Sequence, residues 1–162
     1  MKKRKRLQIL KNYLKVKNKM EKSFRLGVVG YCPPTKFNEN KAHTYILEAY
    51  NKAVCDFSNR IVVVSGLTNV GVLKLAYEEA KRRGWKTAGV ACKKAFDYKS
   101  SWFPVDQEPV IVGENWGDES FEFIKSIDAL VRIGCGKQSL REASMARNLG
   151  KKTYEYDLER LS

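Results

Sequence analysis

The sequence predicts an α/β protein with a Rossmann-like, doubly wound, mostly parallel sheet of five to six strands and helices on both faces. Three observations lead to this prediction. Short runs of β-branched residues alternate with longer segments of helical periodicity, several helical segments end at glycine, and 162 residues are enough for about one domain. Strands that alternate with helices are joined by right-handed crossovers and therefore run parallel.

The first half of the domain is expected to contain three strands and two helices. Residues 24–32 (FRLGVVGYC) form a short β-branched run, and residues 38–54 carry apolar side chains at helical spacing. Residues 61–64 (IVVV) indicate a buried strand. Residues 70–84 indicate a helix, because a cationic last turn followed by glycine is typical of a helix end. Residues 87–92 (TAGVAC) are expected to form the third strand.

The second half continues the alternation after an irregular segment. Residues 93–109 carry aromatic residues with weak periodicity, which predicts a long loop with one helical turn at most. The remaining strands are expected at 109–113, 128–134 and 152–156, and the remaining helices at 118–127, opened by Asp118, and at 138–150, ended by glycine.

Most of the positive charge lies near the N-terminal end of the chain. The formal net charge is +13, of which residues 1–25 carry +10 and the remainder only +3. We expect residues 1–24 to form a basic extension that is partly helical, and residues 25–162 to form a single domain. Three roles remain open for the extension: packing on its own domain, joining a second copy, or weak contact with nucleic acid or another anionic surface.

The composition argues against several classes of protein. No apolar run approaches the length of a membrane-spanning helix, and lysines interrupt the segment where a signal peptide would need an apolar core. We therefore expect a cytoplasmic protein. Four cysteines without a CxxC pair and a single histidine, His43, predict neither a disulfide nor a metal site, and no resident cofactor is indicated.

Two glycine-bearing turns follow expected strands and lead into expected helices. One contains Gly66, Thr68, Asn69 and Gly71; the other contains Gly134, Gly136, Lys137, Gln138 and Ser139, followed by Glu142; and Gly30 ends the first strand. Free amides at a helix start attract phosphate, and glycine lets a ligand approach the backbone. The alternative is local: Thr68 or Asn69 caps its helix, and Ser139 with Glu142 forms a capping box.

Two such turns in one domain favour a nucleotide as the ligand. Ligands of doubly wound sheets bind outside the carboxyl ends of the strands, where two helix starts can hold a phosphate and place a carboxylate beside the sugar. Tyr31, Trp102, Phe103 and Trp116 are candidate walls or covers for the base, although loop aromatics also pack in small clusters of their own.

The same segments resemble the SLOG superfamily of Rossmann-like nucleotide-binding proteins. This group includes the lonely-guy phosphoribohydrolases, the molybdenum-cofactor carrier proteins and the DNA-processing protein DprA. Residues 65–84 (SGLTNVGVLKLAYEEAKRRG) are similar to the lonely-guy pattern YGGGxxGLMGxxAxxAxxxG, and residues 134–142 (GCGKQSLRE) to PGGxGTxxE. In the second match Gly136 falls on a glycine and Glu142 on the catalytic glutamate. The resemblance covers about residues 25–157.

The resemblance implies a nucleotide-binding domain that can form homodimers, and one departure from it bears on activity. The lonely-guy enzymes use an arginine together with the glutamate, and the corresponding residues 113–123 (GENWGDESFEF) contain none. Lys93, Lys94 or Lys137 would have to replace it. Three functions stay open: a SLOG-type nucleotide-binding protein, a phosphoribohydrolase-like nucleotide N-glycosidase that uses Glu142, and a nucleic-acid-associated protein that acts through its basic tail.

Overall fold

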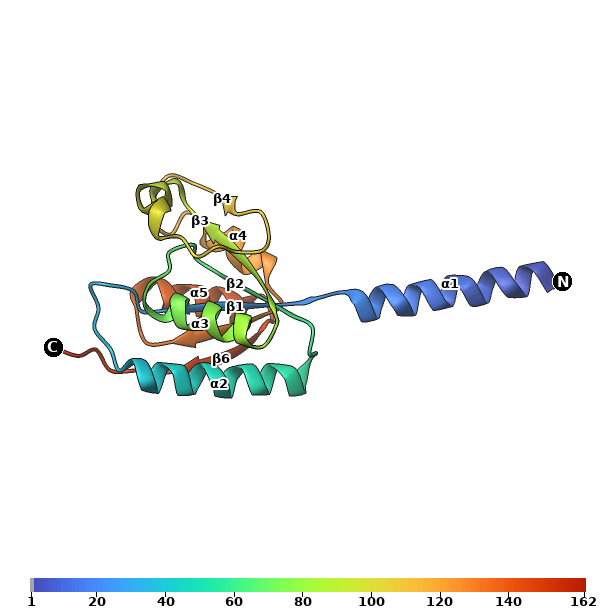
Figure 1. Cartoon of the computed structure of the whole chain (residues 1–162), viewed down its shortest axis with the longest axis horizontal. Coiled ribbons are helices and arrows are strands. Elements are labelled where there is room, and N and C mark those ends of the chain that lie inside the picture. Colours follow the sequence, from blue (N-terminus) through green and yellow to red (C-terminus); the bar gives the residue numbers. More distant parts are fainter. Residues whose placement is uncertain (1) are drawn as a thin grey trace.

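The computed structural model describes residues 2–162, without the side chains of residues 2 and 18–21. Its centre is a six-stranded, entirely parallel sheet in the order β4-β3-β2-β1-β5-β6 (Figure 1). The strands are β1 (Phe24–Gly30), β2 (Ile61–Ser65), β3 (Lys86–Ala91), β4 (Val110–Ile111), β5 (Ala129–Ile133) and β6 (Lys152–Tyr156). The helices are α1 (Lys2–Glu21), α2 (Glu39–Asp56), α3 (Gly71–Arg82), η1 (Lys93–Ser101), α4 (Ser120–Ser126) and α5 (Lys137–Asn148). The predicted fold class is confirmed.

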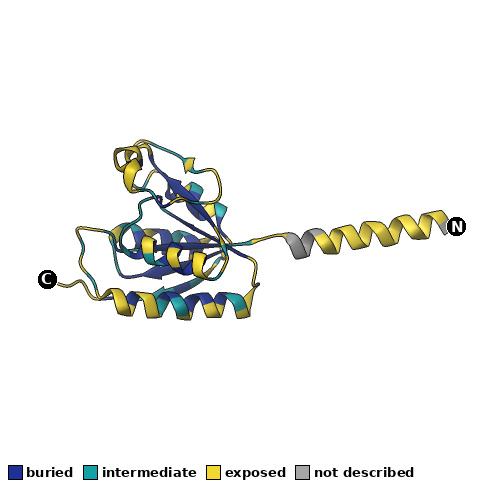
Figure 2. Ribbon diagram, in the orientation of Figure 1, coloured by how far each residue is buried: buried dark blue, intermediate teal, exposed yellow. Residues whose placement is uncertain are grey.

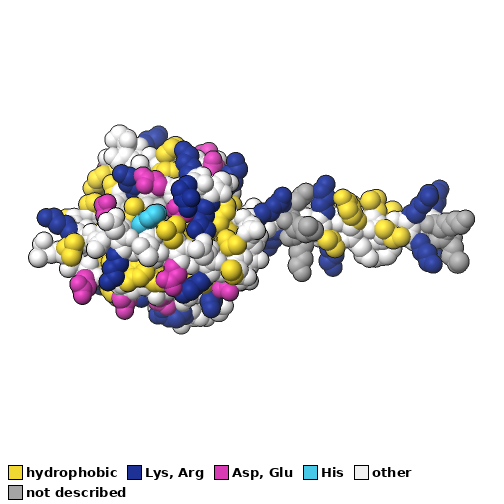
Figure 3. Space-filling model, turned by 60° about the horizontal axis from the view of Figure 1, so that its bottom comes forward, with side chains coloured by type: hydrophobic (Ala, Val, Ile, Leu, Met, Phe, Trp, Pro, Cys, Tyr) yellow, Lys and Arg dark blue, Asp and Glu magenta, His cyan; other side chains and the backbone are white. Residues whose placement is uncertain are grey.

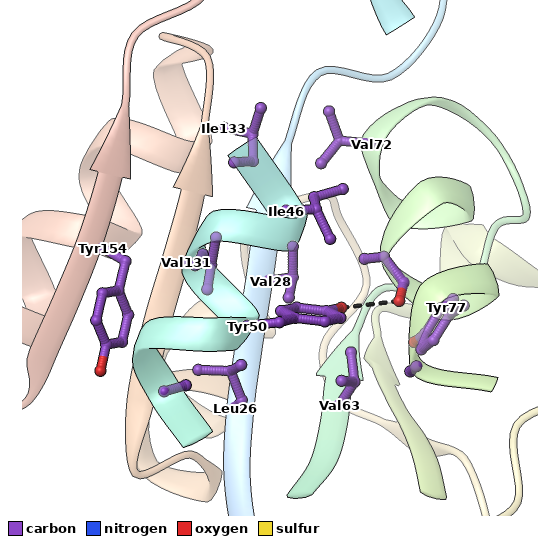
Figure 4. Packing of buried hydrophobic residues seen from close by; sticks show 14 of the residues in the cluster. Leu26, Val28, Ile46, Tyr50, Val63, Val72, Tyr77, Val131, Ile133 and Tyr154 are labelled. Carbon is purple, nitrogen blue, oxygen red and sulfur yellow. Dashed lines mark hydrogen bonds between the residues drawn. The ribbon is translucent and has the colours of Figure 1, made fainter. Parts of the chain in front are cut away.

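Helices cover both faces of the sheet, as double winding requires. Helices α2 and α3 pack together on one face, and α4 and α5 on the other, so that each face buries its own apolar cluster (Figure 2). Tyr50 of α2 lies fully buried in the first cluster and donates a 2.7 Å hydrogen bond to the Ala76 carbonyl of α3 (Figure 4). Because β1, β2 and β5 are covered on both sides, their sequences are almost continuously apolar.

The segment between β3 and β5 differs most from the prediction. Residues 93–101 form 3₁₀ turns instead of a loop with at most one helical turn, and β4 has only two residues. Helix α4 begins at Ser120, and Asp118 does not open it. The Asp118 carboxylate instead accepts the backbone N–H groups of Glu114 and Asn115 at 3.0 and 2.8 Å, which closes the preceding turn.

Helix α1 extends away from the domain and does not pack on it (Figure 1). All side chains of residues 3–17 are exposed, including Leu7, Leu10 and Leu14. Packing on the body is therefore not seen, which leaves a second copy or an anionic surface as roles for the extension. None of the helices within residues 2–162 is both long and apolar enough to span a membrane.

Candidate functional site

A cavity of about 630 Å³ opens at the carboxyl ends of β1, β2 and β3, beside the start of α5. The winding of the sheet reverses here. From β1 the chain adds β2, β3 and β4 on one side, with α2 and α3 on one face of the sheet, and it then adds β5 and β6 on the other side of β1, with α4 and α5 on the opposite face. The cavity wall includes Val28, Leu67, Val90 and Phe123 and is largely apolar. Doubly wound sheets bind their ligands at this position, so the cavity is the candidate site.

The structure brings most of the predicted site residues to this one cavity. Those that line it are Gly30, Gly66, Thr68, Gly136, Lys137, Gln138, Ser139 and Glu142. Three predicted residues, Asn69, Gly71 and Gly134, lie behind the lining. The two turns meet because β2 and β5 are the two neighbours of β1 in the sheet.

Gly71 and Gly134 let the two turns pack closely against Tyr31. Each glycine has a positive φ, +59° and +92°, and a Cβ atom at Gly71 would collide with the Tyr31 carbonyl, one at Gly134 with its ring. The Tyr31 carbonyl also accepts the N–H of Val72 at 2.9 Å. Tyr31 is only 4% exposed, so it holds the two turns together more than it offers an open wall to a base.

Neither Thr68 nor Asn69 caps α3. The cap residue is Val70, whose side chain makes no capping hydrogen bond. Thr68 forms an antiparallel bridge with Trp102, and the backbone N–H of Asn69 donates to the Ser101 carbonyl at 2.7 Å. The capping alternative for this turn is therefore wrong; the turn is held by the segment that follows η1.

The capping box predicted as an alternative at α5 is also absent. The cap residue is Gly136, which places Ser139 at the third helical position instead of at the cap, and among the described residues no side chain caps this helix. The first backbone N–H groups of a helix have no partner within the helix. The amides of Lys137, Gln138 and Ser139 thus begin α5 uncapped, and all three residues line the cavity.

Glu142 lies in the wall of the cavity and is 5% exposed. Burial, which disfavours the charged carboxylate, raises its pKa to about 8, and the neighbouring Glu119 adds to this shift, while the Gln138 side chain and Arg141 oppose it. Glu142 is therefore mostly protonated at neutral pH. In this state the carboxyl group can donate a hydrogen bond to a ligand.

Glu119 is a second carboxyl group in the cavity, and it is not among the site residues predicted from the sequence. It is 7% exposed and accepts hydrogen bonds from the backbone N–H of Gly117 at 3.0 Å and from Gln138 Nε2 at 3.1 Å. In the sequence, residues 113–123 were notable only because they lack the arginine of the lonely-guy enzymes. The available signal was the acidic pair of residues 118–119 at the start of an expected helix.

The cations at the cavity are not those that the sequence suggested, with one exception. Lys93 is paired with Glu114, and Lys94 does not line the cavity, whereas Lys137 does. A second cation comes from Arg160, which follows the last strand. Arg160 lies outside every strand-to-helix turn, so the topological argument could not single it out.

Aromatic side chains form part of the rim. Tyr98 and Trp116 both line the cavity, about half exposed, with ring centroids 6.2 Å apart. Trp102 instead donates its indole N–H to the Ala95 carbonyl, and Phe103 stacks on Tyr77 in the core. Of the predicted covering aromatics in this segment, only Trp116 reaches the cavity.

Metal and sulfur chemistry has little support in the described part of the chain. No group of three or more His, Cys, Asp or Glu side chains there could hold a metal ion. The four cysteines are free thiols, of which only Cys92 is buried. His43 lies 3.6 Å from the Glu79 carboxylate, away from the cavity lining.

These features define a Rossmann-like domain with a cavity at the switch point of its sheet. Solved structures of molybdenum cofactor proteins have the same fold. The carrier protein from Chlamydomonas reinhardtii matches with a TM-score of 0.62 and 22% identity, over 83% of this chain and 76% of that one. The binding protein from Rippkaea orientalis matches with a TM-score of 0.63 and 18% identity, over 83% and 77%.

A further solved structure, the structural-genomics target TM1055, matches with a TM-score of 0.60 and 23% identity, over 80% of this chain and 72% of that one. No family model and no curated protein sequence matches the chain. At these identities the likeness shows the fold, which is that of the molybdenum cofactor carrier proteins.

Proposed function

We propose that the cavity binds a nucleotide or a nucleotide-derived molecule through its phosphate and its ring. The observation that carries this proposal is the uncapped start of α5, which lines the same cavity as two cations and an aromatic rim. Helix starts of this kind favour anions, because unpaired amides and the helix dipole act together. The cavity volume of about 630 Å³ suits a small molecule of this size.

The two ends of such a ligand would meet different chemistry. The phosphate would accept the amides of residues 137–139 beside Lys137, and the ring would lie between the apolar wall and the rim formed by Tyr98 and Trp116. Two of the structurally similar proteins are named for carrying or binding the molybdenum cofactor. Our proposal includes ligands of that type.

We favour a binding protein over the nucleotide N-glycosidase because residues 113–123 lack the arginine that the lonely-guy enzymes use together with their glutamate. Cleavage of an N-glycosidic bond passes through a transition state with positive charge on the sugar, which an ionised carboxylate stabilises. Because the pKa of Glu142 is raised to about 8, most of this carboxyl group is uncharged at pH 7. In that state it can donate a hydrogen bond to a bound ligand, or act as a general acid toward a leaving group.

Titration with nucleoside 5′-monophosphates separates the two functions. We expect the wild-type protein to be stabilised thermally by a bound monophosphate, by about 2.7 kcal/mol at a ligand concentration a hundred times Kd. Chromatography of the same samples should show no free base. Release of base that disappears in Glu142→Gln would establish the hydrolase instead, and a protein that no nucleotide stabilises would contradict the binding proposal.

A second role is supported by the exposure of α1. Its large apolar side chains are 48–68% exposed and occupy one half of the helix: Leu7, Ile9, Leu10, Tyr13, Leu14 and Val16. Lys11 and Lys15 lie on the opposite half, and the helix as a whole contains nine Lys or Arg and one Glu (Figure 3). Over residues 7–16 this is the arrangement of helices that lie in the surface of an anionic membrane, whereas Arg6 and Lys17 at the two ends lie on the apolar half.

The other partners explain only part of this pattern. Nucleic acid would neutralise the lysines and leave the apolar half in water, and a second α1 would cover the apolar half but bring like charges together. We propose that α1 binds anionic lipid. Leu10→Gln with Leu14→Gln should abolish sedimentation with phosphatidylserine-containing vesicles, as should Lys11→Gln with Lys15→Gln. Binding to RNA that the leucine changes leave intact, or self-association without vesicle binding, would contradict this role.

A further inference from the structure

The chain after β6 forms a strap beside the cavity and contributes Arg160 to its lining. This strap, residues 157–162, is anchored on both sides of the position that faces the cavity. The Tyr31 hydroxyl donates to the Leu158 carbonyl at 2.9 Å, and the Leu161 N–H donates to the Lys36 carbonyl at 2.8 Å. Leu158 is buried in the core cluster of α2 and α3. The backbone of the strap is therefore fixed before any ligand arrives.

The strap is also tied to the turn that starts α5. Arg132, 6% exposed on β5, donates from one end of its guanidinium to the Gly134 carbonyl and from the other to the Asp157 carboxylate at 3.0 Å. Asp157 further accepts from Cys135 Sγ at 3.4 Å. A buried arginine thus holds the turn and the strap in one relative position.

Arg160 lies between the two strap anchors and lines the cavity. Its guanidinium carbon is 5.5 Å from the centre of the Tyr31 ring. A Cβ atom on Gly136, the residue that begins α5, would lie 3.8 Å from the same ring. The guanidinium and the open helix start therefore share one aromatic ring as a neighbour. Arg160 forms no ion pair with a carboxylate among the residues that the structure describes.

We propose that Arg160 is a ligand-binding residue, whose guanidinium holds the phosphate of the ligand against the start of α5. A guanidinium presents a planar fork that matches two oxygens of one phosphate, which an ammonium group cannot do. Together with Lys137 and the amides of α5, it provides the positive charge needed for a phosphate ester with a charge of about −2. Arg160, near the other end of the sequence, thus supplies the guanidinium that residues 113–123 lack.

This inference rests on the proposed function for the nucleoside part of the ligand. The phosphate site itself can be tested separately with inorganic phosphate. Calorimetry should compare AMP, GMP, their nucleosides and inorganic phosphate on the wild-type protein, Arg160→Gln and Arg160→Lys. We expect Arg160→Gln to weaken a bound monophosphate roughly tenfold to a hundredfold and to change the affinity for its nucleoside less than about twofold. Arg160→Lys should recover only part of the loss.

Lys86→Gln is the matched control. It removes one positive charge at the amino end of β3, whereas the cavity lies at the carboxyl ends of the strands. Equal monophosphate affinity in the wild type and Arg160→Gln would overturn the inference. An equal loss for nucleoside and monophosphate would overturn it as well, because a strap that merely closes the cavity gives that result. Phosphate binding that depends on Arg160, without nucleotide binding, would support the anion site and refute the proposed function. A wild type that binds none of these probes would contradict both.

Discussion

Replacing Glu142 by glutamine removes a titrating carboxyl group from the cavity wall without changing its shape. The carboxyl is buried, and its pKa rises from 4.5 to about 8 in the folded protein. In the unfolded chain the group returns to its ordinary pKa, so it releases its proton at a lower pH there than in the fold. The stability of the wild-type protein must therefore depend on pH through this residue.

The sign and size of the dependence follow from the two pKa values. Below about pH 4.5 both states are protonated, and Glu142 brings no penalty. Between pH 4.5 and pH 8 only the unfolded state ionises, so the free energy of unfolding falls by about 1.4 kcal/mol per pH unit. The total loss is about 5 kcal/mol at pH 8 and above, with about 3 kcal/mol of it reached at pH 7.

Urea unfolding of the wild type and Glu142→Gln from pH 4 to pH 9 measures this effect. The difference in the free energy of unfolding at pH 4 gives the effect of replacing the protonated carboxyl by an amide. From there to pH 8 the stability of the variant relative to the wild type should rise steadily. Glu122→Gln, an exposed carboxyl on α4, is the control and should show no such trend. A difference between wild type and Glu142→Gln that stays constant across this range would refute the raised pKa, and with it the role of Glu142 as a hydrogen-bond donor at neutral pH.

Three further predictions concern Tyr31 and the rim of the cavity. Gly71→Ala should destabilise the fold by about 3 kcal/mol or more in urea unfolding, because it adds a collision with the Tyr31 carbonyl to the strain of a positive φ; Gly84→Ala, with the same strain but open space, should cost about 1 kcal/mol. Tyr31→Phe should cost about 1–3 kcal/mol by the same assay, since the Leu158 carbonyl loses its donor, and an unchanged midpoint would count against that bond. A bound monophosphate should quench tryptophan fluorescence, and Trp116→Phe should remove most of the quenching; full quenching in the variant would place the ring elsewhere.

The sheet and the place of the site could be predicted because they depend on patterns that are local in the sequence. The runs at 61–64 and 129–131 are apolar throughout, as is typical of strands covered on both faces, and the helices between them have clear periodicity. Parallel strands then put every strand-to-helix turn at one edge. The two glycine-bearing turns come together because β2 and β5 both lie next to β1, and this strand order is typical of a doubly wound sheet.

The parts that escaped prediction depend on contacts between distant segments. Arg160 reaches the cavity because Leu158 is buried and Tyr31 binds its carbonyl, 127 positions along the chain, and no local pattern around residue 160 records that contact. Glu119 likewise contacts Gln138, 19 positions along the chain, and the acidic pair of residues 118–119 does not record that contact. Ser139 and Glu142 have the spacing of a capping box, yet the helix begins earlier, at Gly136, so the spacing alone led to the wrong alternative.

The glycines indicated the right location for a reason that is largely independent of the ligand. A Cβ at Gly30 would collide with the Ile133 carbonyl and Val72, one at Gly71 with Tyr31, and one at Gly134 with the Tyr31 ring. These collisions are all with the protein itself, so the glycines let two turns pack closely around the end of β1. Close packing places the uncapped start of α5 within reach of Arg160 on the strap. Ligand recognition therefore depends on amides and side chains that meet only because the glycines allow it, and a larger residue at Gly134 should weaken phosphate binding without touching the phosphate.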